Sequence, residues 1–332
     1  MLCINLKNTD PFFCLATEEY LLKNFKDDIF LLWQSTDTVV VGKHQNALSE
    51  INYPFVIKHN IRVARRISGG GAVFHDTGNV NFAYIKNVPD SSKINFSDFT
   101  FKIINALKKL NINSTSSGKN DILIDGKKIS GNAEHIYKNR VLHHGTLLFN
   151  SDLHKLGEAL KSGSGVRYHD KAVQSRKSEV TNILPCITKN LNISDFINFL
   201  TAEELKSPDS SFYLLNESDL REINALAENK FMTWDWNFGY SPKYLFTTLV
   251  SLNGADLNIR LNVAKGIIKD AVVTGSYFNS NDSLILSGEL SGKRHIYKDI
   301  RDLLEKYSGK RTIKSSDNYS EQTEDKLIFA FF

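Results

Sequence analysis

The chain has 332 residues, 41% of them hydrophobic and 23% charged, a composition typical of a globular protein with room for one large domain and a smaller one. Its net charge of +4 suits an anionic substrate or an acidic protein partner, but it is too small and too scattered to indicate a nucleic-acid partner. No window approaches about 18 uninterrupted apolar residues, so neither a membrane span nor a membrane partner is expected.

The three cysteines are Cys3, Cys14 and Cys186, and no two of them form a C-x-x-C pair. Their odd number and wide spacing argue against a disulfide framework or a zinc site, and for a reducing compartment. The first residues, MLCINLKNTDPFF, lack the basic region and the long apolar region of a secretory signal. We therefore expect a cytoplasmic protein.

The first predicted element is a helix, because Asp10 is a favourable N-cap, Pro11 suits a first turn, and apolar residues follow at helical spacing. The next expected elements, in order, are strands at 29–33 and 38–42, strand-like segments at 61–68 and 71–76, a strand at 80–85, an amphipathic helix at 99–110, a hairpin at 122–130 and a strand at 141–149. This order predicts an α+β fold whose core is a mixed, mainly antiparallel sheet.

The second half of the chain is predicted to contain a separate small unit. Residues 161–182 are rich in glycine, serine and charge, which predicts a mobile surface loop, and a junction is expected near 232–244. Beyond it the list of expected elements is a strand with alternating Leu257, Ile259, Leu261 and Val263, a Lys265-Gly266 turn, a second strand and a helix at 296–307. We predict a catalytic domain of residues 1–244 and a C-terminal α/β accessory domain of residues 245–332.

Residues 65–76 read RRISGGGAVFHD and lie between two predicted strands. They match neither a phosphate loop nor a dinucleotide fingerprint, both of which precede a helix. Three glycines would nevertheless leave bare backbone N–H groups against which a ligand can lie. Arg65 and Arg66 face opposite ways, so only one can point into a shared site. A bulged hairpin with surface arginines explains the stretch equally well.

The hairpin ILIDGKKIS (122–130) has Asp-Gly at its tip, a strong signal for a two-residue turn. Such a turn pairs Asp121 with Ser130 and makes Asp121 and Lys128 diagonal neighbours on one face, roughly 7–8 Å apart at the backbone. That gap is too wide for a comfortable ion pair but suits a metal-bound phosphate, with Asp121 facing magnesium and Lys128 the charge that develops on an oxygen. A solvated hairpin lysine is the alternative.

His143 and His144 are adjacent on the predicted strand 141–149, so they face opposite ways and cannot chelate one ion. Such a pair favours one core residue and one site residue. His75, beside Asp76, is equally consistent with a structural histidine.

The motifs RRISGGGAVFHDTGNVNF (65–82), GKNDILIDGKKISGNA (118–133) and RVLHHGTLLFNSDL (140–153) together closely resemble those of lipoate–protein ligases. ATEEYLL (16–22), VVVGKHQNALSEIN (39–52) and TWDWNFGYSP (233–242) match the same family in the same order. The resemblance implies a catalytic domain of the biotin/lipoate-ligase fold followed by a small accessory domain.

The family's reaction has two steps, which the resemblance implies here. The carboxylate of lipoate attacks the α-phosphate of ATP, giving lipoyl-AMP and pyrophosphate. A lysine of an apo lipoyl domain, in a 2-oxoacid dehydrogenase complex or the glycine-cleavage H protein, then takes the acyl group as an amide. ATP, Mg²⁺ and lipoate, with octanoate as an alternative acid, are therefore the expected small molecules.

The resemblance also assigns site residues by motif position. Lys128 would be the essential lysine that touches the adenylate phosphate and the lipoyl carbonyl. The other assignments are Arg66 and the backbone of Gly71, Ala72, Val73 and Phe74 along the adenylate, Asp121 at magnesium-bound phosphate, and His144 beside the acyl group. The chain departs from the family at SRKSEVTN (175–182), where Glu179 stands at a position that is usually basic.

Other functions stay open at this point. They are an ATP-independent lipoyl or octanoyl transferase of the same fold, a transferase that takes preformed lipoyl-AMP, and a non-catalytic lipoate-binding protein. All three cysteines lie outside the glycine, lysine and histidine motifs, which counts against a thioester route. Intact Lys128, Asp121 and Arg66 count against a degenerate site. Biotin ligation is disfavoured because a G-R-G-R-rich loop is absent.

Overall fold

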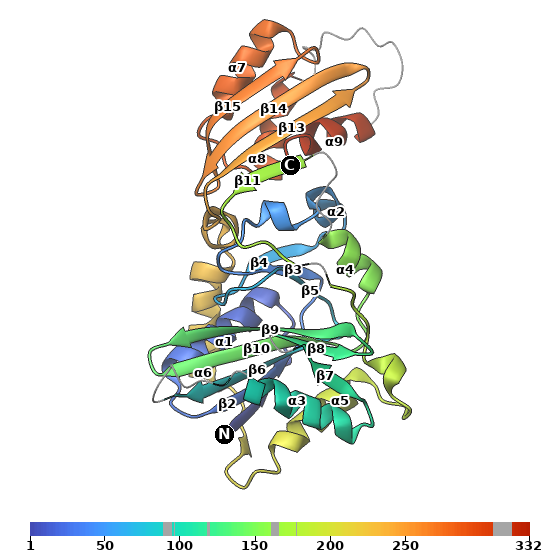
Figure 1. Cartoon of the computed structure of the whole chain (residues 1–332). Coiled ribbons are helices and arrows are strands. Elements are labelled where there is room, and N and C mark those ends of the chain that lie inside the picture. The colour runs from blue at the N-terminus through green and yellow to red at the C-terminus, as the bar shows by residue number, and fades with distance from the viewer. Residues whose placement is uncertain (89–94, 96, 118–119, 161–165, 177, 308–320) are drawn as a thin grey trace. The chain divides into compact units, whose positions relative to one another are not determined.

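The computed structural model describes residues 1–88, 95, 97–117, 120–160, 166–176, 178–307 and 321–332. The chain forms two compact units (Figure 1). Unit 1 comprises Met1–Lys43, Arg62–Gly157 and Ser175–Thr233, and unit 2 comprises His44–Ile61, Glu158–Gln174 and Trp234–Phe332. Two internal segments therefore cluster with the C-terminal part of the chain. The boundary expected after residue 244 stays a prediction.

The helices are distributed over both units. They are α1 (Pro11–Asn24), α2 (Tyr53–Lys58), α3 (Ser97–Lys109), α4 (Leu153–Ala159), α5 (Ile193–Glu204), α6 (Glu217–Leu226), α7 (Ser280–Leu290), α8 (Tyr297–Leu304) and α9 (Glu321–Phe329). Short 3-10 turns lie at Leu48–Glu50, Leu184–Cys186 and Glu305–Tyr307, and π-helical turns lie at Ala227–Phe231 and Asp235–Gly239.

Within the described residues, the strands form three sheets. The large sheet has the order β12 (Ser211–Phe212), β1 (Leu2–Asn5), β2 (Ile29–Trp33), β6 (Asn79–Asn87), β10 (Arg140–Leu148), β9 (Lys127–Tyr137), β8 (Asp121–Ile124) and β7 (Ser114–Ser116). A small sheet has the order β4 (Arg62–Arg65), β3 (Thr38–Val41) and β5 (Val73–His75). The sheet of unit 2 has the order β11 (Val166–Asp170), β13 (Tyr244–Leu252), β14 (Ala255–Ala264) and β15 (Ile267–Gly275).

The large sheet is parallel from β12 to β2 and antiparallel from β2 to β7, as the sequence predicted for a mixed, mainly antiparallel core. One face of the sheet packs against α3 and α5. Phe99 of α3 and Phe196 of α5 belong to one hydrophobic cluster with Phe82 of β6 and with Phe149, which directly follows β10. Helix α1 contacts the sheet at β6 and β10. Since neighbouring residues of a strand face opposite ways, each central strand contributes to both packing layers.

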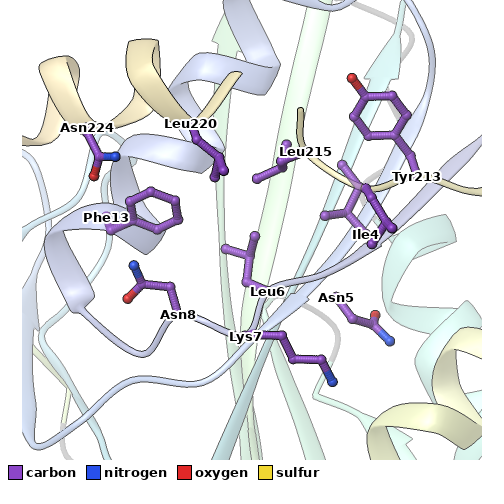
Figure 2. A pocket seen from close by; sticks show the side chains of 11 residues that line it. Ile4, Asn5, Leu6, Lys7, Asn8, Phe13, Tyr213, Leu215, Leu220 and Asn224 are labelled. Atoms are coloured by element: carbon purple, nitrogen blue, oxygen red, sulfur yellow. The ribbon is translucent and has the colours of Figure 1, made fainter. Parts of the chain in front are cut away.

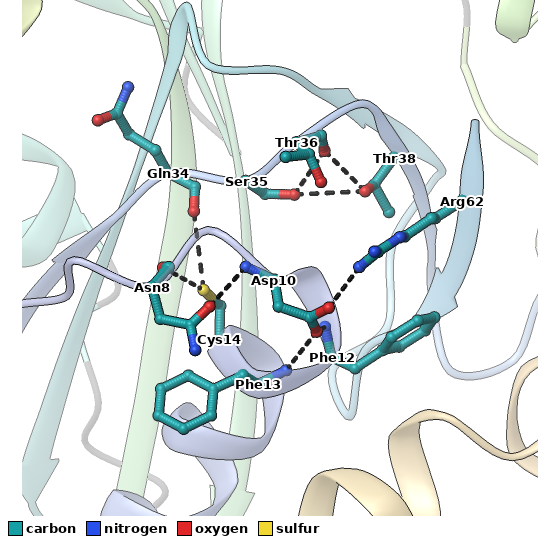
Figure 3. Close-up of polar contacts among 10 residues, drawn as sticks. All are labelled: Asn8, Asp10, Phe12, Phe13, Cys14, Gln34, Ser35, Thr36, Thr38 and Arg62. Carbon is teal, nitrogen blue, oxygen red and sulfur yellow. Dashed lines mark hydrogen bonds and ion pairs between the residues drawn. The ribbon is translucent and has the colours of Figure 1, made fainter. Parts of the chain in front are cut away.

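Helix α1 begins as the sequence predicts. The Asp10 carboxylate accepts hydrogen bonds from the backbone N–H groups of Phe12 (2.9 Å) and Phe13 (3.1 Å), and it also pairs with Arg62 (Figure 3). Such a cap stabilises a helix by about 1 kcal/mol. The Cys14 thiol donates to the carbonyl of Asn8, which ties the helix to the segment before it. This junction fixes the position of α1 against the strands of unit 1.

The strands on the two sides of the glycine run do not pair with each other. β4 runs parallel to β3 and β5 antiparallel to it, so the glycines connect two opposite edges of the small sheet. Arg65 and Arg66 are both buried. The reading of this stretch as a bulged hairpin with surface arginines is therefore wrong, because β3 lies between the two strands.

The β8–β9 hairpin has the predicted Asp-Gly tip, with positive φ at both residues (50° and 77°). Its register differs from the prediction after the second pair. Ser130 lies opposite Ile122 and Gly131 opposite Asp121, because a bulge leaves Ile129 as an extra residue on β9. The expected pairing of Asp121 with Ser130 is wrong. The extra residue reverses the alternation of β9, so Gly131 comes to the same face as Lys128.

The sheet of unit 2 shows the alternation that the sequence predicts. Leu257, Ile259, Leu261 and Val263 of β14 are all buried, and the residues between them are exposed or half-buried. Helix α7 contacts β15 and helix α9 contacts β13. The predicted Lys265-Gly266 turn is present, with φ values of 53° and 66°. The side chains Phe331 and Phe332 are buried, and the Phe332 ring stacks on His295 at 4.8 Å.

The segment 161–182 was predicted to be a mobile surface loop, and in part this is wrong. Residues 166–170 form β11, which pairs antiparallel with β13. The Tyr168 ring contacts the rings of Tyr244 and Phe246, so the strand is held by aromatic packing that the polar composition does not indicate. Residues 161–165 and 177 lie outside the described residues.

In the part of the chain that the structure describes, no helix combines the length and the apolar character needed to cross a membrane.

Candidate functional site

Lys128 and Asp121 form an ion pair on one face of the β8–β9 hairpin. The Lys128 Nζ lies 2.9 Å from the Asp121 Oδ1, and both side chains are about one quarter exposed (24% and 29%). The expectation that the gap is too wide for an ion pair is wrong. A Cβ on Gly131 would lie 2.8 Å from the Lys128 Cε and Nζ, so the lysine side chain passes over a residue that has none. The bulge and the glycine together allow the pair to form.

The backbone of Lys128 is held by the segment that follows Ser175. Its N–H donates to the Glu179 carbonyl (2.8 Å), and its carbonyl accepts from the N–H of Thr181 (3.0 Å). The Glu179 carboxylate lies 2.7 Å from the Lys127 Nζ, and this pair raises the pKa of Lys127. The unusual glutamate thus has a charge partner on the same hairpin. Lys128 is bound on both sides, by β8 and by this segment.

Arg66 organises the glycine run from beneath. Its guanidinium donates to the carbonyls of Gly69 (2.6 Å) and Gly71 (2.8 Å), to the Val40 carbonyl and to the Ser68 hydroxyl. Burial lowers the pKa of Arg66 to about 10, so the side chain stays charged at neutral pH. Because these four bonds use most of its five N–H donors, the arginine acts first as the support of the loop.

The glycine run also needs close backbone approach. A Cβ on Gly42 would lie 2.1 Å from the Gly70 carbonyl oxygen, and Gly70 itself has φ of 86° and lies against the Ala133 side chain. A side chain at either position would therefore push the loop away from its neighbours. The predicted adenylate wall, residues 71–73, is half-buried, whereas the Phe74 side chain is buried.

The predicted wall contacts the segment that holds Lys128. The N–H of Ala72 donates to the Ser175 hydroxyl (2.7 Å), and Ser175 lies over Gly71. Val180, which bridges to Lys128, is only five positions after Ser175, and an extended chain of that length spans at most about 17 Å. One short segment therefore connects the glycine run with the lysine.

His144 belongs to a buried polar network that sequence reasoning largely missed. Its Nε2 lies 2.6 Å from the Ser68 Oγ, and its Nδ1 lies 2.7 Å from the Glu18 Oε2. The other oxygen of Glu18 accepts from the Trp33 Nε1 (3.0 Å). A neutral His144 satisfies the network when Nδ1–H donates to Glu18 and Nε2 accepts from Ser68.

Three residues of this network, Glu18, Trp33 and Ser68, were not predicted as site residues. The sequence offered one indication of them. The two glutamates of ATEEYLL lie among apolar residues of a predicted helix, and both are buried in the structure. Carboxylates at such positions need partners, because an unpaired charge is costly to bury. Nothing in the order of the sequence indicates that those partners come from β2 and the glycine run.

His143 faces the opposite side of the sheet, as predicted. Its ring stacks on Phe99 of α3 at 4.9 Å, and burial lowers its pKa. Burial, aided by Arg66 and His144, also lowers the pKa of His75 to about 3, and its ring packs edge-on against Trp33. Both histidines are neutral core residues at physiological pH.

Asp121 can serve a divalent cation that arrives with phosphates. Across the described residues no cluster of three or more His, Cys, Asp or Glu side chains is close enough to hold a metal ion. Magnesium is commonly bound by one or two carboxylates together with substrate phosphates, and does not need such a cluster. The Asp121 Oδ1 bonds Lys128. Its carboxylate is partly exposed, so the residues present fit a magnesium ion delivered by a nucleotide.

A cavity of about 370 Å³ lies elsewhere in unit 1. It follows the end of β1 and is mostly apolar, and Figure 2 shows the side chains of Leu6, Phe13 and Leu220 converging on it. None of the predicted site residues lines it. We therefore assign it no part in the site.

Comparison with known proteins defines the class. A family model described as the lipoyl protein ligase A/B catalytic domain matches residues 10–204, and one described as the bacterial lipoate protein ligase C-terminus matches residues 241–324. The chain therefore has the two-part organisation of this class of ligases. Among curated relatives, lipoate–protein ligase 1 of Staphylococcus aureus is 38% identical over 301 residues, covering 90% of this chain and 92% of its own.

Solved structures of lipoate–protein ligases also resemble this chain. P. falciparum LipL1 in complex with lipoate has a TM-score of 0.61 at 25% identity and covers 99% of each chain. A lipoate-protein ligase A bound with ATP also has a TM-score of 0.61 at 25% identity, covering 72% of this chain and 98% of its own. The chain belongs to the lipoate–protein ligase family. The predicted family, α+β fold and ATP-dependent ligase class of enzyme are thereby confirmed.

Proposed function

We propose that this protein joins lipoate to ATP as lipoyl-AMP at the Lys128 hairpin and then transfers the lipoyl group to a lysine of an apo lipoyl domain. The observation that carries the proposal is the segment 175–181, which bonds the backbone of the glycine run at one end and that of Lys128 at the other. It supports a single site that has a bare backbone wall and a fixed ammonium group.

In the first step a lipoate carboxylate oxygen attacks the α-phosphorus of ATP, and the bond to the pyrophosphate oxygen breaks. Negative charge builds on the phosphoryl oxygens in the transition state. The Lys128 ammonium pairs with Asp121, and two hydrogen bonds hold the backbone of the same residue. A cation positioned in advance in this way needs little reorganisation to face that charge, which is an effective form of electrostatic stabilisation. Gly71, Ala72, Val73 and Phe74 would offer the adenylate their backbone, supported from beneath by Arg66.

In the second step the neutral amine of the acceptor lysine attacks the lipoyl carbonyl, a tetrahedral oxyanion forms, and AMP leaves as the amide forms. The attacking nitrogen loses one proton as the amide forms, and this proton is released to the solvent. Lys128 would stabilise this second anion from the same position, so one cation serves both steps. His144, fixed by Glu18 and Ser68, would border the acyl group.

Magnesium would be held by Asp121 together with the phosphates of ATP, and when bound it would neutralise phosphate charge. The ligand-free ion pair keeps this carboxylate next to Lys128. Asp121→Asn is therefore expected to raise the magnesium concentration needed for adenylation.

The finer identities are also proposals. The acid would be lipoate, with octanoate as an alternative, and the acceptors would be lipoyl domains of 2-oxoacid dehydrogenase complexes or the H protein. We assign the reaction to the cytoplasm, residues 1–244 to the catalytic domain and residues 245–332 to the accessory domain. The separate matches of two family models support this division.

A thioester route through Cys3 or Cys14 is disfavoured by the burial of their thiols. Cys3 and Cys14 are fully buried. Burial raises the pKa of Cys3 to about 11 and that of Cys14 well above its usual value, so neither thiol is a ready nucleophile.

The deciding experiment measures pyrophosphate release from ATP and lipoate, with no acceptor present. A full ligase releases pyrophosphate and forms lipoyl-AMP, which mass spectrometry detects. No release, combined with turnover of supplied lipoyl-AMP, would replace the proposal by a transferase that depends on another adenylating enzyme. If the protein carries out neither reaction, the remaining function is that of a non-catalytic lipoate-binding protein. A panel of apo lipoyl domains then identifies the acceptor.

A further inference from the structure

Two lysine ammonium groups contact the buried carboxylate of Glu19, which directly follows Glu18 of the His144 network. The Glu19 carboxylate is 2% exposed and lies 2.6 Å from the Nζ of Lys23 and 2.6 Å from the Nζ of Lys230. Lys23 comes from the last turn of α1 and Lys230 from the π-helical turn 227–231. The three groups join these two elements and leave one net positive charge.

Two further features extend this charge to the surface. The Tyr137 ring, at the end of β9, has the Lys23 ammonium 5.5 Å from its centroid and the Lys138 ammonium 5.2 Å from it. Lys138 is exposed, and 41% of the Lys23 side chain is exposed. An aromatic ring between two cations presents both apolar area and positive charge, a combination that is enriched at protein interfaces.

Lys43 and His135 complete the group. Burial lowers the pKa of both Lys230 and His135, and the charges of Lys23 and Lys43 lower it further. Lys43 is half-buried, and among the described residues its ammonium group has no hydrogen-bond or ion-pair partner. We call Lys23, Lys43, Lys138, Lys230 and His135, with Glu19 and Tyr137, the lysine patch. It holds four ammonium groups and one carboxylate, which pairs with Lys23 and Lys230.

The lysine patch adjoins the proposed acyl site through three separate connections. Glu19 directly follows Glu18, which bonds His144. The N–H of Lys43 donates to the carbonyl of Ser68, the other partner of His144. His135 lies two residues along β9 from Ala133, which pairs with His144, a spacing of about 7 Å.

We propose that the lysine patch docks the acidic surface of the acceptor protein when the acyl group is transferred. The inference rests on the proposed function and adds the recognition of the protein substrate. The positive groups come from four separate segments, and two of them, Lys23 and Lys138, flank the half-buried Tyr137 ring, which favours an extended protein surface over a single small anion. Complementary charge of this kind speeds and orients encounter, and it does not act on the chemistry itself.

The test separates docking from chemistry. Lys43→Glu reverses the charge of an unpaired ammonium without touching the proposed machinery. We expect a rise of about tenfold in KM for an acidic apo lipoyl domain, because like charges then meet at the interface. Pyrophosphate release from ATP and lipoate, and the reaction of lipoyl-AMP with hydroxylamine as a small uncharged acceptor, should stay within about twofold of the wild-type rates.

Matched variants and salt sharpen the result. Lys138→Glu should raise the same KM, while Lys108→Glu, an exposed lysine on α3, should not. Added salt should raise the wild-type KM and have a smaller effect on Lys43→Glu, since exposed charges are screened.

Two outcomes overturn the inference. An acceptor KM that Lys43→Glu and Lys138→Glu leave unchanged would exclude acidic docking at this patch. Slower pyrophosphate release by Lys43→Glu with an unchanged acceptor KM would indicate a subsite for a small anion. If the wild-type protein releases no pyrophosphate, the proposed ligase function is contradicted. This result differs from the two outcomes above, which concern the lysine patch alone.

Discussion

The two units treat buried polar groups very differently. Unit 1 buries Glu18, Glu19, Arg65 and Arg66 almost completely, and each has bonded partners. Unit 2 buries His295 in an aromatic cluster, where burial lowers its pKa to about 4 and keeps it neutral. Removing one partner of a buried charge costs roughly 3–5 kcal/mol. The buried charges of unit 1 lie in or beside the segments to which we assign chemistry, whereas the carboxylates that unit 2 buries, Glu50 and Asp282, belong to none of them.

The largest expected effect is on the chemistry of unit 1. Lys128→Ala should lower the rate of acyl-adenylate formation by about 10²–10³-fold, the usual loss when one group that stabilises a transition-state anion is removed. The fold should stay intact, because the side chain is about one quarter exposed and its ion pair with Asp121 contributes roughly 1 kcal/mol or less. Pyrophosphate release and circular dichroism measure the two effects.

The adjacent lysine provides the control for this variant. Lys127→Ala removes an exposed side chain whose partner is Glu179, and it should keep nearly full activity. Wild-type-like turnover by Lys128→Ala would remove the central role given to this ammonium group.

Gly131→Ala should separate activity from stability within unit 1. The new Cβ would lie 2.8 Å from the Lys128 Cε and Nζ, and a flexible lysine end can move away at little cost to folding. A catalytic group displaced by about 1 Å can lose roughly 10²-fold in rate. We expect such a loss in pyrophosphate release with a thermal midpoint close to that of wild type. Gly288→Ala, where a Cβ meets nothing within 4 Å, is the matched substitution and should leave the rate unchanged.

Gly266→Ala, in unit 2, should lower stability and leave activity unchanged. Gly266 has φ of 66°, and a Cβ there would lie 2.6 Å from the Trp234 ring. A left-handed conformation alone costs about 1–2 kcal/mol for a residue other than glycine. We expect a lower urea midpoint by tryptophan fluorescence, with adenylation per folded molecule preserved. A stability equal to that of wild type would show that unit 2 repacks around the turn.

Acid should weaken both units to a similar degree. The unfolded chain takes up protons on His75 and His295 near pH 6.5, whereas folding lowers their pKa values to about 3 and about 4. Between about pH 6.5 and pH 4 the unfolded state therefore binds more protons, and stability falls as pH falls. The limiting slope is about 1.4 kcal/mol per pH unit for each histidine.

Urea titrations from neutral to mildly acidic pH measure this slope. His295→Gln should reduce it, since the variant removes one of the two groups that titrate in this window. If the slope of that variant matches the wild type, His295 takes up its proton in the folded protein too.

Much of the fold could be predicted because its signals are local. The Asp10 cap, the Asp-Gly turn and the alternation along β14 each depend on a few consecutive residues, and all three are present in the structure. Strand β11 was missed because its packing depends on Tyr244 and Phe246, which lie more than seventy residues further along the chain. The assigned roles of the individual site residues stay predictions.

The candidate site was predicted less completely, for a related reason. The motifs identified Lys128, Asp121 and Arg66, but the bulge at Ile129 could not be seen, and it places Gly131 beside the Lys128 side chain, which forms an ion pair of 2.9 Å with Asp121. A one-residue shift of register moves every later side chain to the other face of a strand. Ser68 and Glu18 were missed because their common partner, His144, is distant in the chain.

The sequence by itself determined which side chains are available: a glycine run after two arginines, a lysine on an Asp-Gly hairpin, and carboxylates on an apolar helix face. The tertiary structure decided which of them meet. It buried Arg66 under the glycines and brought Lys128 over Gly131. Turns and caps are fixed by interactions within a few residues, whereas these contacts depend on strand register and on segments that only folding brings together.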